Sequence, residues 1–330
     1  MFNLLAIGDP IIDTHVQIGD DSAKCRLLTE QNEKKLCLDY GAKIPIVDSF
    51  QALGGNASNV AVAAVKLGLS AALVSTIGDD ANGHTILEKL KHFSVNSDYV
   101  TFESGATSRY SIVLNYCGER TILSYSEKKN YIWPEPIAAA EWVYYTGLSE
   151  GFEPIQAELF RYLENHQAAQ LVINPGSYML RYALPALREA ISRADIVIVN
   201  LEEAELILET TMEKEKNISA LIHGLCELGA EEAVLTDGEH GAWAGNKEEV
   251  WHVEAFPVSV TSKTGAGDAF SAAYMAARHY GLDYAAALLW GAANSYGVIQ
   301  AHGPHAGLMK KEGITKTIAR FPNVKPTLVK

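Results

Sequence analysis

The sequence lacks the patterns that would place it in several large classes of protein. Its 4 cysteines are far apart and have no C-x-x-C spacing, so neither a disulfide framework nor a zinc site is expected (Cys25, Cys37, Cys117, Cys226). No apolar run is long enough to span a bilayer and no cationic leader opens the chain, so we expect a cytoplasmic location. Lys and Arg number 27 against 40 Asp and Glu, and the formal charge of −13 argues against nucleic acid or an anionic membrane as partner.

Two common motifs of nucleotide-binding enzymes are also missing. The first apolar run, residues 2–7, is followed by Gly8-Asp9-Pro10 and not by G-x-G-x-x-G, which disfavours a dinucleotide-binding dehydrogenase. No G-x-x-x-x-G-K-[ST] occurs, which excludes a P-loop. An anionic ligand would therefore be bound through backbone dipoles or a metal ion.

Short apolar runs alternate with helical patterns along most of the 330 residues. Strands are predicted at residues 2–7, 71–77, 142–145, 171–173, 195–199 and 233–235, with short ones near 242 and 251. Helices are predicted at about 60–67, 154–167, 182–191, 202–209, 218–228 and 284–299, with others ending near 92 and starting at 270. This alternation predicts an α/β fold: a doubly wound, mostly parallel sheet between two helical layers.

Two segments interrupt that alternation. Residues 14–49 combine charged clusters with short β-like pieces, and within 98–130 the pattern predicts a hairpin of residues 110–116 and 120–125. We interpret the two segments as one small separate sheet inserted into a single domain of residues 1–330.

Polar or glycine-rich clusters follow the predicted strands repeatedly. They are Gly8-Asp9, Gly78-Asp79 and residues 174–176, 200–203 and 236–241. In α/β sheets, ligands bind where the carboxyl ends of the strands meet. We therefore expect these clusters to converge on one site.

The stretch 261–270 is the most informative. Gly265 and Gly267 relax the backbone just before a helical pattern that starts at Phe270. The N–H groups of residues 265–268 would then gather at the positive end of a helix, which is a favourable anion site. Asp268 is either the N-cap of this helix or a base beside a bound phosphate. These residues alone leave both roles open.

Two segments resemble a known family. Gly54-Gly55-Asn56-Ala57-Ser58-Asn59 and Lys263-Thr264-Gly265-Ala266-Gly267-Asp268-Ala269-Phe270 are similar to the two signatures of the ribokinase-like (PfkB-type) carbohydrate kinases, and the likeness covers essentially the whole chain. The resemblance implies a ribokinase-like fold in which the two inserted segments form a lid over the substrate. It also implies an ATP-dependent phosphotransferase that uses Mg²⁺ and acts on a hydroxyl of a small sugar or sugar-like molecule.

The resemblance also implies roles for individual residues. Asp268 matches the general base, and the backbone of Gly265, Ala266 and Gly267 matches the anion hole for the transferred phosphoryl group. Substrate contacts are implied for Asp13, Gly54, Gly55, Asn56 and Asn59. Nucleotide contacts are implied for Asn200, Glu203, Thr236, Gly238, Gly241, Asn294 and Gly303, and Glu203 is further expected to hold Mg²⁺ through water.

One departure from the family pattern concerns a monovalent cation. The family usually has an Asp two residues before the Thr of the second signature, and this Asp commonly helps to hold an activating cation. Here Ser262 and Lys263 occupy the two positions before Thr264. We hypothesise that potassium activation is weak or absent and that the Lys263 ammonium stands in for the cation; alternatively, Lys263 points to solvent.

Other interpretations stay open at several positions. Asp13 could be a turn residue, Asn56 and Ser58 could be helix caps, and Glu203 could belong to a solvated acidic helix turn. Three histidines in predicted loops are expected at the surface (His240, His302, His305). The alternative functions are a nucleoside kinase of the same fold and a catalytically silent sugar- or nucleotide-binding protein. A homodimer formed through the lid is a further possibility.

Overall fold

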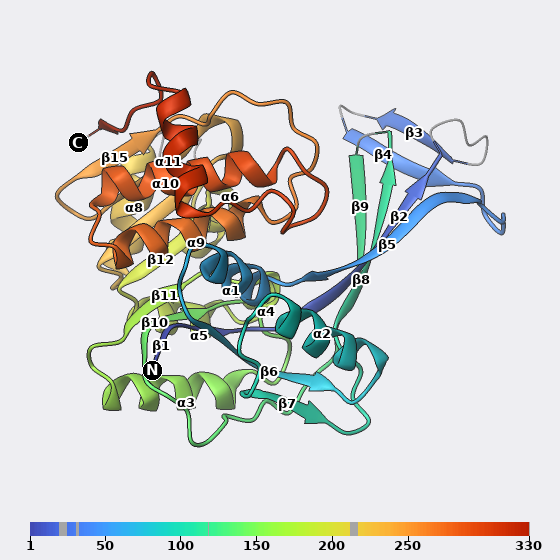
Figure 1. The fold of residues 1–330 in the computed structure, drawn as a ribbon, viewed down its shortest axis with the longest axis horizontal. Coiled ribbons are helices and arrows are strands. Elements are labelled where there is room, and N and C mark those ends of the chain that lie inside the picture. Colours follow the sequence, from blue (N-terminus) through green and yellow to red (C-terminus); the bar gives the residue numbers. More distant parts are fainter. Residues whose placement is uncertain (20–24, 31–32, 118, 212–216, 330) are drawn as a thin grey trace.

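The structure is a computed structural model that describes residues 1–19, 25–30, 33–117, 119–211 and 217–329 (Figure 1). A large α/β body carries a smaller β-sheet that projects to one side, and both termini lie on the large body (Figure 1). Within the described ranges, no helix combines the length and apolar character needed to cross a bilayer.

A large, mostly parallel sheet forms the centre of the body. In the described part of the chain it has 10 strands in the order β16-β15-β14-β13-β12-β11-β10-β1-β6-β7. Their bounds, in the same order, are Thr327–Leu328, Val250–Val253, Ala242–Gly245, Glu232–Thr236, Ile196–Asn200, Gln170–Ile173, Ala140–Tyr145, Phe2–Ile7, Ala71–Gly78 and Val100–Glu103. The strands from β13 to β7 run parallel, and β14, β15 and β16 are antiparallel at one edge. The predicted doubly wound sheet is confirmed.

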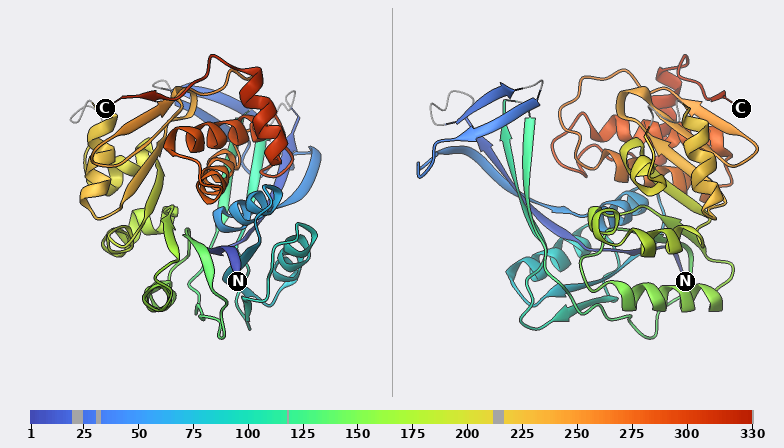
Figure 2. Two further views of the ribbon diagram at one scale, coloured as in Figure 1. Left: turned by 60° about the vertical axis from the view of Figure 1, so that its left-hand side comes forward. Right: turned by 180° about the vertical axis from the view of Figure 1, so that it is seen from behind.

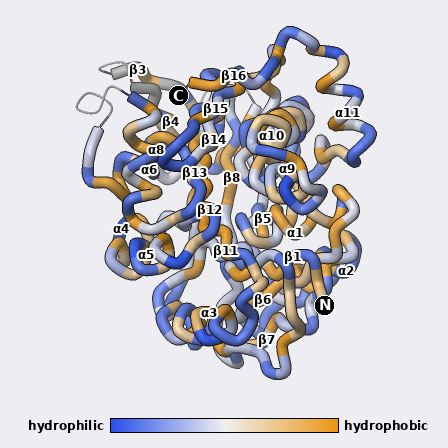
Figure 3. Tube along the Cα trace, turned by 90° about the vertical axis from the view of Figure 1, so that its left-hand side faces the viewer, coloured by the Kyte–Doolittle hydropathy of each residue, from blue (hydrophilic) through white to orange (hydrophobic). Residues whose placement is uncertain are grey.

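Helices cover both faces of this sheet and make three layers (Figure 2). Alternate residues of one strand enter different cores: Leu4 packs in the first and Leu5 in the second, so β1 is apolar on both faces. Hydrophobic residues recur along the trace of the central strands (Figure 3). The first core is covered by α1 (Asn56–Lys66), α2 (Ala81–His92), α9 (Ala266–His279), α10 (Tyr284–Val298) and α11 (Lys311–Arg320). The second is covered by α3 (Glu153–Asn165), α4 (Ser177–Tyr182), α5 (Leu184–Ile191), α6 (Leu201–Leu208) and α8 (Ile218–Glu227).

Three helices differ from their predicted bounds. Helix α1 begins at Asn56 and not near residue 60. The helix expected at 182–191 corresponds to α5, whose first turn holds Pro185, where proline favours a helix start, and the short helix α4 before it was not predicted. Helix α9 begins at Ala266 and not at Phe270, because Gly265 takes the N-cap position with φ of 78°. Apolar periodicity could not show this start, because the first turn of α9 holds only small residues and Asp268.

The small sheet consists of β2 (Ile11–Ile18), β5 (Ile46–Gly54), β8 (Tyr110–Tyr116) and β9 (Glu119–Tyr125) in the order β5-β2-β8-β9. Strands β2 and β8 are parallel, while both outer strands are antiparallel to their neighbours. A separate ribbon of β3 (Cys25–Glu30) and β4 (Glu33–Leu38) lies at its far end (Figure 1). The hairpin expected at 110–125 is therefore present.

The small sheet and the two inserted segments do not coincide fully. β7 lies inside the segment 98–130, yet it pairs with β6 at the edge of the large sheet. β2 begins at Ile11 and β5 continues to Gly54, so the small sheet reaches further toward the body than residues 14–49. As a result its strands end beside the loop that follows β1 and at the start of α1.

Candidate functional site

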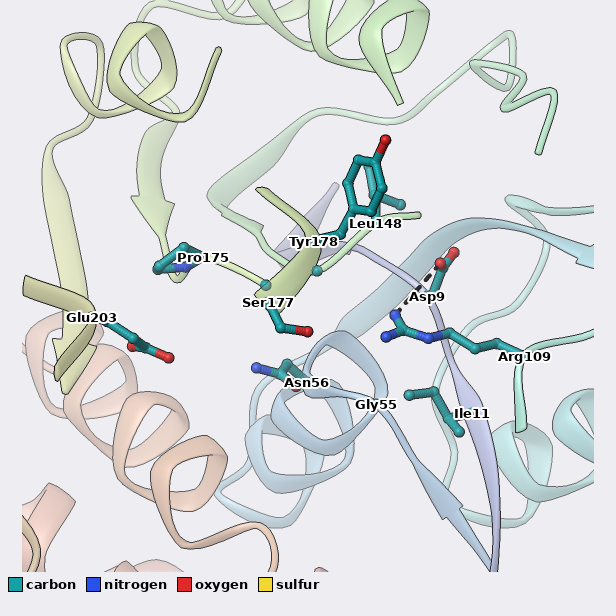
Figure 4. Close-up of a pocket in the computed structure, with 12 residues that line it drawn as sticks. Asp9, Ile11, Gly55, Asn56, Arg109, Leu148, Pro175, Ser177, Tyr178 and Glu203 are labelled. Carbon is teal, nitrogen blue, oxygen red and sulfur yellow. Dashed lines mark ion pairs between the residues drawn. The ribbon is translucent and has the colours of Figure 1, made fainter. Parts of the chain in front are cut away.

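A pocket of about 220 Å³ lies at the carboxyl edge of the large sheet (Figure 4). Asp9 follows β1, Leu148 follows β10 and Ser177 follows β11, and all three line it. Glu203, after β12, stands on the opposite side from Asp9, with Asn56 between them (Figure 4). Polar clusters from distant parts of the chain thus meet at one rim, as expected for strands of a parallel sheet.

Asp9 is a buried hydrogen-bonding centre at the pocket wall. It is 2% exposed, and its two carboxylate oxygens accept hydrogen bonds from the Tyr131 hydroxyl at 2.9 and 2.8 Å. Ser149 Oγ donates to it at 2.8 Å, and Arg109 Nη1 lies 3.7 Å from it. Asp9 therefore keeps the Arg109 guanidinium at the edge of the pocket (Figure 4).

Asp13 lies on β2, beside the end of β5. Ser111 Oγ on the paired strand β8 donates to its carboxylate, and burial raises the pKa of Asp13 above its usual value. A Cβ on Gly54 would collide with this carboxylate, so the absence of a side chain at Gly54 makes room for Asp13. Asp13 is thus part of a strand and not a turn residue.

The helix α1 starts at the next residues. Gly55 is its N-cap with φ of 94°, a conformation that L side chains rarely adopt. Asn56 does not cap this helix: its Nδ2 reaches across the rim and donates to Asn174 Oδ1 at 3.1 Å. Ser58 donates back to the carbonyl of Gly55 at 2.9 Å and faces the helix start, not the pocket.

The start of α9 matches an anion site. Among the described residues, the N–H groups of Gly265, Gly267 and Asp268 have no protein acceptor, and that of Ala266 lies 3.4 Å from the Lys263 carbonyl. A Cβ on Gly267 would meet nothing within 4 Å, so the space in front of the helix is open. Free N–H groups at the positive end of a helix dipole favour a negatively charged ligand.

Asp268 lies in this first turn but does not cap it. The N-cap is Gly265, and no side-chain cap is formed, so the helix-cap interpretation of Asp268 is wrong. Asn59 Nδ2 donates to Asp268 Oδ2 at 2.8 Å. Burial raises the pKa of Asp268 to about 6, and the charge of Asp13 also raises it, while the Asn59 hydrogen bond lowers it. Such a carboxylate can accept a proton near neutral pH.

Asn200 and Glu203 form a capping box at the start of α6. Glu203 N donates to Asn200 Oδ1 at 2.9 Å, and Asn200 N donates to Glu203 Oε2 at 3.0 Å. Burial raises the pKa of Glu203 to about 7, and the charge of Asp268 also raises it. A buried carboxylate whose pKa is also raised by a neighbouring carboxylate suits a divalent cation, and an oxygen donor suits Mg²⁺.

The other residues expected to contact the nucleotide fall into two groups. Thr236 ends β13, and Gly238 and Gly241 form the turn before β14 with φ of 51° and 92°. Gly303, with φ of 83°, lies in the loop after α10. Asn294 is different: it is 0% exposed.

The side chain of Asn294 is fully engaged in the core. Its Nδ2 donates to the Ala269 carbonyl at 2.9 Å, and its Oδ1 accepts from Met309 N at 3.0 Å. The expected contact of Asn294 with the nucleotide therefore has no exposed atom to make it. The two hydrogen bonds of the Asn294 side chain connect α10 to α9 and to the loop before α11.

A second pocket of about 430 Å³ lies between the small sheet and the body, and we call it the lid pocket. His15 and Phe50 on the small sheet line it and stack with ring centroids 4.5 Å apart. Lys263 and Gly303 line the opposite wall. Beside it, Arg120 of β9 donates to Thr264 Oγ1, just before the anion site.

Comparison with known proteins identifies the family. The pfkB family carbohydrate kinase description matches residues 31–311. The chain belongs to the PfkB family of carbohydrate kinases. It is a sugar kinase.

Several curated proteins resemble this PfkB-family kinase. Ribokinase of Bacillus subtilis (strain 168) is 30% identical over 250 residues, which cover 73% of this chain and 79% of the relative. Fructokinase-2 of Zea mays is 30% identical over 238 residues, which cover 67% of this chain and 69% of the relative.

Solved structures share its fold. Arabidopsis thaliana ribokinase complexed with ribose and ATP gives a TM-score of 0.78 at 21% identity, over 96% of this chain and 98% of that one. A protein assigned as ribokinase II from E. coli, with ATP and Mg²⁺, gives a TM-score of 0.75 at 19% identity, over 97% of this chain and 100% of that one. Burkholderia thailandensis nucleoside kinase with inosine gives a TM-score of 0.74 at 17% identity, over 97% of this chain and 99% of that one. At these identities the likeness concerns the fold alone.

Three residues at this candidate site were not predicted from the sequence. Asp9 was noted only as part of the polar cluster after the first strand, and Arg109, in the inserted segment 98–130, was considered as a substrate contact but not chosen. His305 was expected at the surface, yet it is partly buried with Nε2 2.9 Å from Asn59 Oδ1. No local sequence pattern marks these residues, because their polar partners lie between 100 and 246 residues away along the chain.

Gly55 should be essential for the geometry of this kinase. A Cβ at Gly55 would collide with the Asp9 carbonyl in addition to imposing strain at φ of 94°. Gly281 has φ of 75° and open space around it, so it provides a control with strain alone. We expect Gly281→Ala to cost about 1 kcal/mol and Gly55→Ala about 3 kcal/mol or more in the free energy of unfolding. Equal values in urea titrations would contradict the collision.

Proposed function

We propose that this protein transfers the γ-phosphoryl group of ATP to a hydroxyl of a small sugar, with Asp268 as general base. The observation that supports it is the first turn of α9, where a carboxylate with a pKa of about 6 stands among N–H groups that have no acceptor in the described parts of the protein. Phosphoryl transfer requires alignment and charge stabilisation, together with a base for the attacking hydroxyl. A protein that only binds its ligand has no use for a carboxylate in an anion site.

The acceptor would lie in the pocket between Asp9 and Glu203. Asp13 offers hydrogen-bond acceptors, Arg109 offers donors and Asn56 offers both, which suits the hydroxyl groups of a sugar. Gly54 and Gly55 would let the sugar approach the backbone. Because Asp13 and Asp268 interact electrostatically, a hydroxyl held near Asp13 would be close to the base.

The phosphoryl donor would lie on the other side of Asp268. The backbone N–H groups of Gly265 to Gly267 would bind the transferred group, and the turn at Gly238 would contact the nucleotide. Glu203 fits Mg²⁺ because it offers carboxylate oxygens, and its pKa is raised by burial and by the charge of Asp268. When bound, Mg²⁺ would neutralise charge on the phosphates. Asn200 would act by capping α6 and thereby orienting Glu203.

The small sheet would act as the lid over this site. The Arg120 hydrogen bond to Thr264 supports this role because it joins β9 to the loop of the anion site. A closed lid would keep water from competing with the sugar hydroxyl. Exposed apolar side chains on its strands, such as Val47 at 69% and Leu123 at 53%, support pairing of two chains through their lids, which sedimentation velocity can test.

A nucleoside acceptor is the second candidate. The stacked His15 and Phe50 rings in the lid pocket lie 4° from parallel, and such a surface suits a planar base. A panel of free sugars, sugar acids and nucleosides, scored by ADP release with Mg-ATP, separates the candidates. Release with sugars alone supports the first, release with nucleosides alone supports the second, and no release with any acceptor contradicts a kinase.

Asp268→Asn should abolish turnover and preserve ATP binding. The amide keeps an oxygen that can accept from Asn59 but cannot take a proton, so we expect a loss of at least about 10²-fold in kcat. Because the folded-state pKa of Asp268 is raised, its charge is unfavourable above about pH 6, so the variant should be at least as heat-stable. Calorimetric titration with ATP provides the control. Undiminished turnover would contradict the base.

The pH profile should show the ionisation of Asp268. Its carboxylate form, which is the active one, predominates above pH of about 6, so kcat/KM should be constant above this value and fall about tenfold per pH unit below it. Initial rates from pH 4.5 to 8.5 at saturating Mg-ATP test this. A rate that is unchanged down to pH 4.5 would show that another group takes the proton.

Potassium should have little effect on the rate. Ser262 lacks a carboxylate and Lys263 is exposed at the lid pocket, where its ammonium would replace a bound cation. At constant ionic strength, we expect less than about a twofold change when choline replaces K⁺. The double variant Ser262→Asp with Lys263→Thr should acquire K⁺ dependence. A strong K⁺ requirement in the natural protein would contradict this proposal.

A further inference from the structure

Three side chains from distant segments form one chain of hydrogen bonds that ends at Asp268. His305 Nε2, in the loop after α10, lies 2.9 Å from Asn59 Oδ1 on α1. Asn59 Nδ2 lies 2.8 Å from Asp268 Oδ2 on α9. Asn59 is only 6% exposed, so water has little access to the middle of this chain.

The order of donors and acceptors fixes the orientation of the Asn59 amide. Its NH₂ group must face Asp268, because a carboxylate only accepts hydrogen bonds. Its oxygen then faces His305, which must donate through Nε2–H. A rotated amide would place two acceptors against each other at Asp268. The carboxylate therefore sets the amide orientation, and the amide oxygen in turn requires the tautomer of His305 that carries its proton on Nε2.

The loop that carries His305 is tied to α9 on both sides. Pro304 packs against the start of the helix, where a Cβ on Gly265 would lie 2.5 Å from Pro304 Cβ. On the other side, Asn294 links Met309 N to the Ala269 carbonyl. The His305 ring also packs on Phe93, with centroids 4.7 Å apart. These contacts fix the position of the His305 imidazole relative to α9, the helix that carries Asp268.

We propose that His305 is a positioning residue for Asp268: through Asn59 it holds one carboxylate oxygen so that the other, Oδ1, faces the acceptor hydroxyl. The inference rests on the proposed function of Asp268 as the base. It also assigns Asn59 to the base, since both ends of its amide are engaged, and not to the sugar. His305 itself touches no substrate and exchanges no proton in the reaction.

The charged groups around these three hydrogen-bonded side chains are compatible with this role. Asp13 on β2 and Glu203 on α6 are the acidic groups that interact with Asp268, and the Tyr144 hydroxyl of β10 also lies within its electrostatic range. Lys89 on α2 is the charged group that acts on His305. Burial, assisted by Lys89, lowers the pKa of His305 to about 4, so the imidazole stays neutral from pH 5 upward. The His305 imidazole therefore remains a neutral hydrogen-bond donor at every pH above 5.

A matched pair of substitutions tests the proposal. Gln and Met have similar length, but only Gln can donate a hydrogen bond to Asn59. We expect His305→Met to lower kcat about tenfold, with little change in the KM for ATP, because Asp268 loses its fixed orientation. The acid limb of the pH profile should move upward in this variant, and His305→Gln should restore both properties. His92→Met is the control, because His92 packs on the same Phe93 ring but is exposed.

A measurement without turnover separates this inference from the proposed function. The carboxyl carbon of Asp268 can be titrated by ¹³C NMR, with its signal assigned by Asp268→Asn. We expect a higher pKa for Asp268 in His305→Met than in the natural protein or in His305→Gln. If no acceptor is phosphorylated, the proposed function fails, while this titration still tests the hydrogen-bond chain. The positioning role would be overturned if the pKa of Asp268 were unchanged in a folded His305→Met variant. It would also be overturned if His305→Met and His305→Gln lowered kcat equally.

Discussion

The site depends on the environment of one carboxylate. Burial makes the charged form of Asp268 unfavourable, while the Asn59 amide and the positive end of α9 favour it. The balance leaves its pKa at about 6, which lies close to the pH at which a general base is most effective. A more exposed carboxylate would be a weaker base, and one without the amide would have a higher pKa. The packing around α9 therefore sets the chemistry that the rim can perform.

The same local device positions both halves of the site. Gly55 and Gly265 are N-caps with positive φ, and each starts a helix at the carboxyl edge of the sheet. The helices α1 and α9 pack against each other on one face, so their first turns lie side by side. Close approach of backbone to ligand is possible at both because neither cap has a side chain. Asn59 then connects the two helices chemically as well as sterically.

Much of the fold could be predicted because central strands carry apolar residues on both faces and helices carry one apolar stripe. That logic missed β7, which lies at the sheet edge, and the first turn of α9, which has no large apolar residue. For the site, the glycine-led segments were visible because positive φ demands glycine. Asn294 was misinterpreted for the opposite reason: an amide in an alanine-rich helix suggests a ligand contact, yet its partners are backbone groups in the core.

The sequence by itself determined the order of the elements, the glycine-led helix starts and the family, because each of these is encoded in residues that are neighbours along the chain. The tertiary structure alone decided which polar groups meet: Asp9 with Tyr131, Asn59 with Asp268 and His305 with Asn59. These pairs are joined by hydrogen bonds of about 3 Å between residues more than 100 positions apart. Periodicity reports only how one element faces its core, whereas such contacts depend on how the crossovers bring several loops to the same edge of the sheet.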